Sequence, residues 1–225
     1  MNKKFLFVFI MLMAFQLLAQ ERQQCKEHDL LLMPTAFTME RGRHYFTSYN
    51  IILANYSYAL TNRVHIAMLG MLPVIKNSTR VASVGIKYNL LNSDKGGVAL
   101  YGTYFPDDSH FTIGGIYSHQ FSNKLSGHIS IGYFAGNPDP PNGTSVMIGI
   151  KHEINKKSAF IVEYLHVPMM RDPEEYSDEP WDLDDNIVIG YRIRGKGYSL
   201  EIGPLINLPW LIPIPVLKAT LYFGR

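Results

Sequence analysis

The chain has 225 residues, of which 47% are hydrophobic, 12% aromatic and only 18% charged. This composition is too apolar for a disordered chain and supplies enough apolar surface for one sizeable domain. The formal charge of +2, from 21 bases and 19 acids, provides no basic field that would bind nucleic acid. The single cysteine, Cys25, excludes an intramolecular disulfide framework and a cysteine-based zinc cluster.

Residues 1–19 have the organisation of a secretory signal peptide. Lys3 and Lys4 form a positive start, and an almost unbroken apolar stretch, 5–18, precedes a cleavage site after Ala19. The stretch is shorter than the roughly 20 residues that span a bilayer, which favours a cleaved signal over the alternative, an anchor helix. Cleavage leaves 19 bases and 19 acids, so the mature chain is formally neutral. Residues 20–29 are then expected to form a flexible mature N-terminus.

From Leu30 onward, short runs rich in Val, Ile, Tyr, Phe and Thr alternate with Gly, Asn, Asp, Ser and Pro. A 3.6-residue periodicity is almost absent, so residues 30–225 are predicted to form an all-β domain. The predicted strands, in chain order, are 30–38, 44–60, 63–73, 79–91, 97–105, 110–121, 125–134, 144–154, 158–167, 186–194, 197–206 and 214–223.

Alternation within these strands and the unequal lengths of their connections favour a membrane barrel. In one run, Ile129 and Ile131 oppose His128 and Ser130 on the two faces. Alternation alone would also fit a soluble β-sandwich. However, every second connection is a short turn, whereas the others include the long segments 136–143 and 168–185. Short turns on one rim and long loops on the other are typical of outer-membrane barrels. The short turns are 61–62, 92–96, 123–124, 155–157 and 195–196.

The last run ends in Leu221-Tyr222-Phe223-Gly224-Arg225, which resembles the aromatic C-terminal strand that outer-membrane barrels present to the barrel-assembly machinery. With the signal peptide, the chain resembles small outer-membrane β-barrel proteins of Gram-negative bacteria. The resemblance implies a porin-like protein of the cell envelope, surrounded by outer-membrane lipid and lipopolysaccharide. Its fold would be a closed antiparallel up-and-down transmembrane β-barrel of about 12 strands, with 10 as the alternative count; the oligomeric state is left open. Interfacial tyrosine girdles are expected from Tyr45, Tyr88, Tyr104, Tyr133, Tyr164 and Tyr198.

The face opposite the apolar stripe carries polar and charged side chains that would line the lumen. Bases outnumber acids there, which would attract anions in a water-filled lumen. In the alternative, acids and bases pair and fill a narrow interior, and the sequence favours this packed state. The predicted lumen residues are Arg63, His65, Lys87, Lys151, Glu153, Glu163, Arg192, Arg194, Glu201 and Lys218.

The segment His128-Ile129-Ser130 places an imidazole and a hydroxyl on one strand face, where a base could activate a nucleophile. It resembles the His-x-Ser core of outer-membrane phospholipase A and of the lipid A 3-O-deacylases. The resemblance implies that His128 is a general base and Ser130 the nucleophile. However, Ile131 stands where those families carry Asn, and Ile129 and Ile131 occupy the lipid-facing wall on which they place the pair. The pattern therefore favours a polar lumen pair.

The segment 172–185 holds eight of the 19 acids. Oxygen-rich clusters bind Ca²⁺, and Asp178, Asp182, Asp184 and Asp185 are the candidate ligands. Because the segment lacks the spacing and glycine of an EF-hand loop, a solvated acidic loop is expected, with no cofactor apart from that candidate ion.

These observations predict an integral outer-membrane β-barrel that acts without catalysis, as a channel, a structural element or a surface-interaction protein. The first alternative is an outer-membrane lipid esterase that uses His128 and Ser130. The second is a secreted soluble β-protein that binds a ligand.

Overall fold

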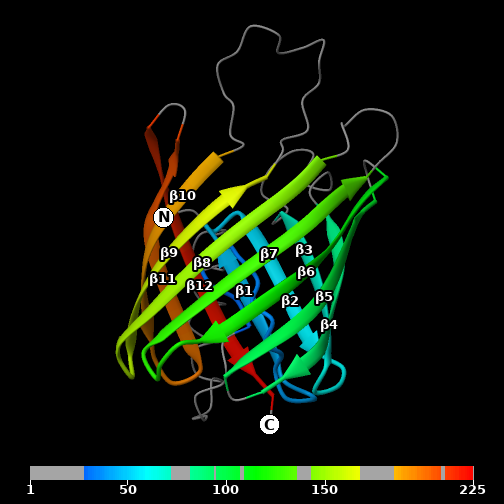
Figure 1. Cartoon of the computed structure of the whole chain (residues 1–225), viewed down its shortest axis with the longest axis horizontal. Coiled ribbons are helices and arrows are strands. Elements are labelled where there is room, and N and C mark those ends of the chain that lie inside the picture. The colour runs from blue at the N-terminus through cyan, green and yellow to red at the C-terminus, as the bar shows by residue number, and fades with distance from the viewer. Residues whose placement is uncertain are drawn as a thin grey trace, which may run out of the picture.

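The computed structural model describes residues 28–71, 82–93, 95–106, 109–135, 143–167, 185–208 and 211–224. They contain a closed antiparallel barrel in which each strand pairs with its sequence neighbours and the first pairs with the last (Figure 1). This confirms the predicted all-β barrel of 12 strands. The strands are β1 (His44–Tyr49), β2 (Leu53–Ala59), β3 (Val64–Met71), β4 (Ser83–Asn92), β5 (Gly96–Phe105), β6 (His110–Gln120), β7 (Leu125–Ala135), β8 (Gly143–Asn155), β9 (Ser158–His166), β10 (Asp185–Arg194), β11 (Tyr198–Asn207) and β12 (Ile212–Phe223).

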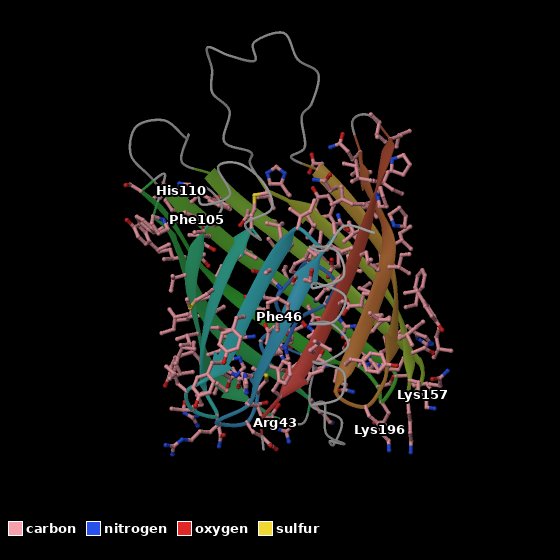
Figure 2. The ribbon with its side chains drawn as sticks, turned by 180° about the vertical axis from the view of Figure 1, so that it is seen from behind. Arg43, Phe46, Phe105, His110, Lys157 and Lys196 are labelled. Atoms are coloured by element: carbon pink, nitrogen blue, oxygen red, sulfur yellow. The ribbon has the colours of Figure 1, made fainter. Side chains whose placement is uncertain are left out.

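The two rims of the barrel differ as the connection lengths predict. The short turns that follow β2, β4, β6, β8 and β10 lie at the rim where β12 ends, at the bottom of Figure 1. We call this the short-turn rim. Among the described residues, no helix is long and apolar enough to cross a membrane. In Figure 2, Arg43, Lys157 and Lys196 mark the short-turn rim. Phe46 lies on the wall, and Phe105 and His110 mark the opposite rim.

The alternation of side chains gives the barrel an apolar exterior. On β7, Ile129 and Ile131 are 38% and 54% exposed, whereas His128 and Ser130, which alternate with them, are buried. Large apolar side chains also face outward from β8, β10 and β11, for example Ile150. An outer wall of this kind is matched to lipid tails and not to water.

Tyrosines occupy both faces of the wall. Tyr88, Tyr104, Tyr133 and Tyr198 are exposed on the outside; the last three lie near the ends of their strands, whereas Tyr88 lies near the middle of β4. The prediction that Tyr45 belongs to an outer girdle is wrong, because odd-numbered positions of β1 face inward and Tyr45 is 7% exposed.

Two predicted strands at the N-terminal end differ from the structure. Residues 30–38 are not a strand, and the single predicted run 44–60 is two strands, β1 and β2, joined by a turn at 50–52. The two errors offset each other, so the predicted number of strands is nevertheless correct.

The β1–β2 hairpin ends part-way along β12. Tyr49, the last residue of β1, pairs with Lys218, and no described strand pairs with residues 212–217 on that side. Asn50 caps this edge, because its side chain donates to the Pro215 carbonyl (3.2 Å) and accepts from the Leu217 N–H (2.7 Å). Every second residue of a strand points its N–H group to the same side, so positions 213 and 215 face the same way as Leu217. Pro213 and Pro215 have no N–H group, and therefore leave no unpaired donor on the side where β1 has ended.

Candidate functional site in the barrel lumen

Residues 28–39, which we call the plug, precede β1 and lie inside the barrel (dark blue in Figure 1). Leu30, Leu31 and Met33 are wholly buried and pack against inward-facing apolar side chains of β9, β10 and β12, including Ile161 and Val188. Residues 28 and 29, expected in a flexible N-terminus, are likewise buried. Four consecutive apolar residues, 30–33, cannot alternate between lipid and lumen, so they fit the interior better than the wall.

Lys87 on β4 binds the plug through its main chain. The ammonium group donates to three plug carbonyl groups, those of His28 (3.2 Å), Thr35 (3.0 Å) and Phe37 (2.8 Å). An ammonium group has three protons and no acceptor, so this arrangement uses its full donor capacity.

Glu163 on β9 supplies acceptors to the same segment. Its wholly buried carboxylate accepts the N–H groups of Leu32 (3.0 Å) and Met33 (3.2 Å). Hydrogen bonds from N–H groups to a carboxylate are stronger than those between neutral groups. Glu163 therefore anchors the turn of the plug that carries its apolar side chains.

A buried charge cluster joins the plug to β10, β11 and β12. Lys218 lies 2.8 Å from the Asp29 carboxylate and 3.8 Å from that of Glu201, and Arg192 lies 3.0 Å from Glu201. Arg192 also donates to the Asp29 carbonyl (3.1 Å), and Lys218 to that of Leu30. Desolvation raises the pKa of Asp29, but the neighbouring positive charges, foremost Lys218, lower it by more, so this pKa lies below its ordinary value.

Glycines on the inner wall provide room for the apolar side chains of the plug. A Cβ at Gly149 of β8 would overlap Leu30 and come within 3.1 Å of the Met33 sulfur. A Cβ at Gly190 of β10 would lie 2.9 Å from Leu31. The wall and the plug are therefore complementary in shape as well as in hydrogen bonding.

The other predicted lumen residues lie closer to the short-turn rim or on the opposite wall. Glu153 pairs with Lys151 (3.0 Å) and accepts two hydrogen bonds from the Arg194 guanidinium (2.7 and 2.9 Å). His65 is buried and accepts the N–H of Met39 in the plug (2.6 Å). Arg63 differs from these, because it is exposed in the turn between β2 and β3.

The catalytic candidates His128 and Ser130 both lie buried in the interior. The two ring nitrogens of His128 are bonded to the hydroxyls of Ser118 (2.8 Å) and Ser126 (3.0 Å), and the Ser130 hydroxyl lies 3.5 Å from that of Tyr101. Ser118 in turn accepts the plug N–H of residue 36 (2.8 Å). The imidazole therefore orients a group that holds the plug, and the pair does not face the lipid.

Of the acidic segment, only Asp185 lies within the described residues; Asp178, Asp182 and Asp184 lie outside them, as does the predicted signal peptide. Asp185 accepts hydrogen bonds from the Tyr164 hydroxyl (2.6 Å) and the His166 ring (3.0 Å). Within the described ranges, no three His, Cys, Asp or Glu side chains are grouped to hold a metal ion.

Sequence reasoning identified the charged wall and missed the segment that it holds. The inward positions follow from strand alternation, whereas the plug was concealed because Leu30 to Met33 are as apolar as a strand. The signal that could have revealed it is the unbroken run of four apolar residues, followed by Pro34.

No protein-family model matches the sequence, and no curated protein sequence does. Solved structures do match the fold. A KdgM porin in complex with disordered oligogalacturonate superposes with a TM-score of 0.53 at 7% identity, over 82% of this chain and 98% of that one. The KdgM porin alone gives 0.51 at 8% identity over the same shares. The NanC porin gives 0.50 at 9%, over 82% of this chain and 99% of its own. The chain thus has the fold of porin-like outer-membrane β-barrels.

Proposed function

We propose that this protein is an outer-membrane channel whose lumen is closed by its own plug. The porin-like fold and the apolar exterior support a place in the bacterial outer membrane. The observation that carries the proposal is the inner wall, which bears charged groups of both signs that bind residues 28–39. A barrel with a purely structural role has no need of a charged wall, because apolar packing would fill its interior at lower cost.

The neighbours do not indicate the solute. One matched KdgM structure contains oligogalacturonate, but the inner wall of the present chain combines Lys87, Arg192 and Lys218 with Glu163 and Glu201. A lumen of mixed charge has no strong preference for a polyanion. We therefore propose channel function without transferring that solute.

Neither alternative function has structural support. The lipid esterase needs His128 and Ser130 at the membrane face, and both side chains are turned inward and packed near the plug. A secreted soluble protein would not expose large apolar side chains such as Ile131 around its wall.

The test compares a closed and a released plug in planar bilayers. A release variant, Leu31→Glu with Met33→Glu, adds two carboxylates beside Glu163 and should expel the plug, because unpaired buried charge is costly. Leu211→Glu is the matched control, since Leu211 is 70% exposed. We expect stepwise currents from the release variant and silence from the control.

A disulfide lock makes the test reversible. The Cβ of Ala36 lies 3.5 Å from the position of a Cβ at Gly97 of β5, within the usual disulfide range of about 3.5–4.5 Å. In a Cys25→Ser background, Ala36→Cys with Gly97→Cys should silence the release variant when oxidised and restore its current when reduced. Labelling of Ala36→Cys by a water-soluble maleimide reports whether the plug has left. A labelled release variant that carries no current would refute channel function.

A further inference from the structure

We infer that the lumen is a peptide-binding site, which takes short peptides with consecutive apolar residues and which the plug occupies as an internal ligand. This inference rests on the proposed function, because a peptide from outside the chain can enter only a lumen that opens.

The wall recognises the main chain of the plug more than its side chains. Lys87 and Glu163 bind plug carbonyl and N–H groups respectively, as described above. Asn89 donates to the carbonyl of Ala36 (2.6 Å), whose N–H is accepted by Ser118 (2.8 Å). Main-chain recognition provides affinity without requiring one sequence, which is how other peptide-binding proteins hold varied ligands.

The apolar side chains of the plug fit recesses that impose a general preference. Leu30 and Met33 lie over Gly149, and Leu31 lies over Gly190. Around them the wall is apolar, with Ile161 and Val188 buried in the same cluster. The site therefore selects a run of medium-sized apolar side chains, and it does so by shape and burial.

The combination of donors and acceptors favours a peptide over an anionic saccharide. Lys87 donates to three carbonyl oxygens, of which a peptide supplies one at every residue, and Glu163 accepts the N–H groups of two adjacent residues. An acidic sugar chain would place carboxylates near Glu163 and Glu201, both wholly buried or nearly so, where like charges repel. A peptide main chain supplies the acceptors that Lys87 binds and the donors that Glu163 binds at the same time.

The covalent link from the plug to β1 explains why the site is filled. A tethered ligand experiences an effective concentration of about millimolar or higher, so a free peptide of similar affinity competes poorly. Binding from outside is therefore expected to be measurable once the plug is displaced, and the wall must be left intact in that experiment.

The experiment uses the full-length release variant, which changes the plug and leaves every wall residue in place. The probe is a fluorescein-labelled synthetic peptide with the sequence of residues 28–39, and binding is followed by fluorescence anisotropy in detergent. The control peptide carries N-methyl groups on the amides of Leu32 and Met33, which removes the donors that Glu163 accepts. We expect the control to bind about ten-fold more weakly or worse, and the unreleased Leu211→Glu protein to bind neither peptide measurably.

A second variant separates main-chain recognition from nonspecific adsorption. Adding Glu163→Gln to the release variant should weaken binding of the unmodified peptide, so that the two peptides bind with similar affinity. Equal binding of both peptides to the release variant, or no binding to a release variant whose plug is shown by labelling to be out, would overturn the peptide site. These outcomes do not depend on current. Channel function can therefore fail while the peptide binds, and the peptide site can fail while current flows.

Discussion

At the scale of single residues, Lys218 is the cation that pairs with carboxylates of both the plug and the wall. Its ammonium group is wholly buried between the Asp29 carboxylate of the plug and the Glu201 carboxylate of the wall. Breaking a buried ion pair by removing one partner typically costs about 3–5 kcal/mol, and Glu201 would retain part of the interaction. Because Asp29 belongs to the plug, loss of this ion pair should weaken the binding of the plug to the wall.

We therefore expect Asp29→Asn to raise the rate of maleimide labelling at Ala36→Cys by about ten-fold or more at neutral pH. The matched control is Glu153→Gln, which breaks two ion pairs on the wall near the short-turn rim, those with Lys151 and Arg194, and involves no plug residue. If Ala36→Cys were labelled at the parent rate in both variants, the ion pair between Asp29 and Lys218 would not hold the plug.

The same carboxylate predicts how the closed state responds to acid. The pKa of Asp29 is below its ordinary value of 3.8 in the folded protein, so the carboxylate stabilises docking above that value. This stability is lost as the pH falls through the lowered pKa. Because the thiolate is the form that reacts with maleimide, the two proteins must be compared at the same pH. The ratio of the labelling rate of Asp29→Asn to that of its parent, both carrying Ala36→Cys, should therefore be high above about pH 5 and fall toward one below about pH 4. A ratio that does not change in acid would contradict the assignment.

At the scale of elements, the β1–β2 turn stores strain that can be removed. Asn50 and Ile51 both have positive φ, 50° and 65°, and the Ile52 N–H closes the turn on the Tyr49 carbonyl (3.0 Å). Asparagine tolerates this region, whereas a β-branched residue rarely adopts it. Turns of this kind favour Asn-Gly.

Ile51→Gly should therefore stabilise the barrel by about 1 kcal/mol, since Ile51 is 60% exposed and loses little burial. Ile52→Gly is the matched control, because Ile52 is not among the residues of positive φ and should be destabilised by the same substitution. The midpoint of urea unfolding, followed by heat-modifiable migration on gels, measures both. A lower midpoint for Ile51→Gly would show that lipid or a loop holds the isoleucine.

This turn also shows what the sequence could and could not predict. Strands β3 to β12 and their faces follow from alternation and from turns marked by Gly, Asn and Lys. The β1–β2 turn carries no glycine or proline, and Ile51 and Ile52 read as strand, so one run was predicted where two strands exist. The plug was missed for a related reason, because burial in a lumen and burial in a sheet both select apolar residues. Only the three-dimensional pairing of β1 with β12 separates them.

At the scale of the whole molecule, the charge of the chain is divided among separate places. Exposed lysines, among them Lys157 and Lys196, occupy the short-turn rim (Figure 2). Buried charges of the lumen form ion pairs, both within the wall (Arg192 with Glu201) and between plug and wall (Asp29 with Lys218). The near-neutral total is therefore the sum of a basic rim, a balanced interior and the acids of the segment 172–185. The rim lysines are Lys95, Lys124, Lys156, Lys157 and Lys196.

The plug and the barrel are expected to be separable parts of one molecule. The wall closes through strand-to-strand hydrogen bonds around the full ring, whereas the plug bonds to inward-facing side chains. The release variant should therefore still migrate as a heat-modifiable barrel, but it should convert to the unfolded form at a lower temperature. Each large apolar side chain that leaves the interior forfeits about 1.5–3 kcal/mol. Oxidation of the lock between Ala36→Cys and Gly97→Cys in the parent should raise the conversion temperature, because it removes freedom from the unfolded chain. A release variant that never forms the heat-modifiable species would show instead that the barrel assembles around the plug.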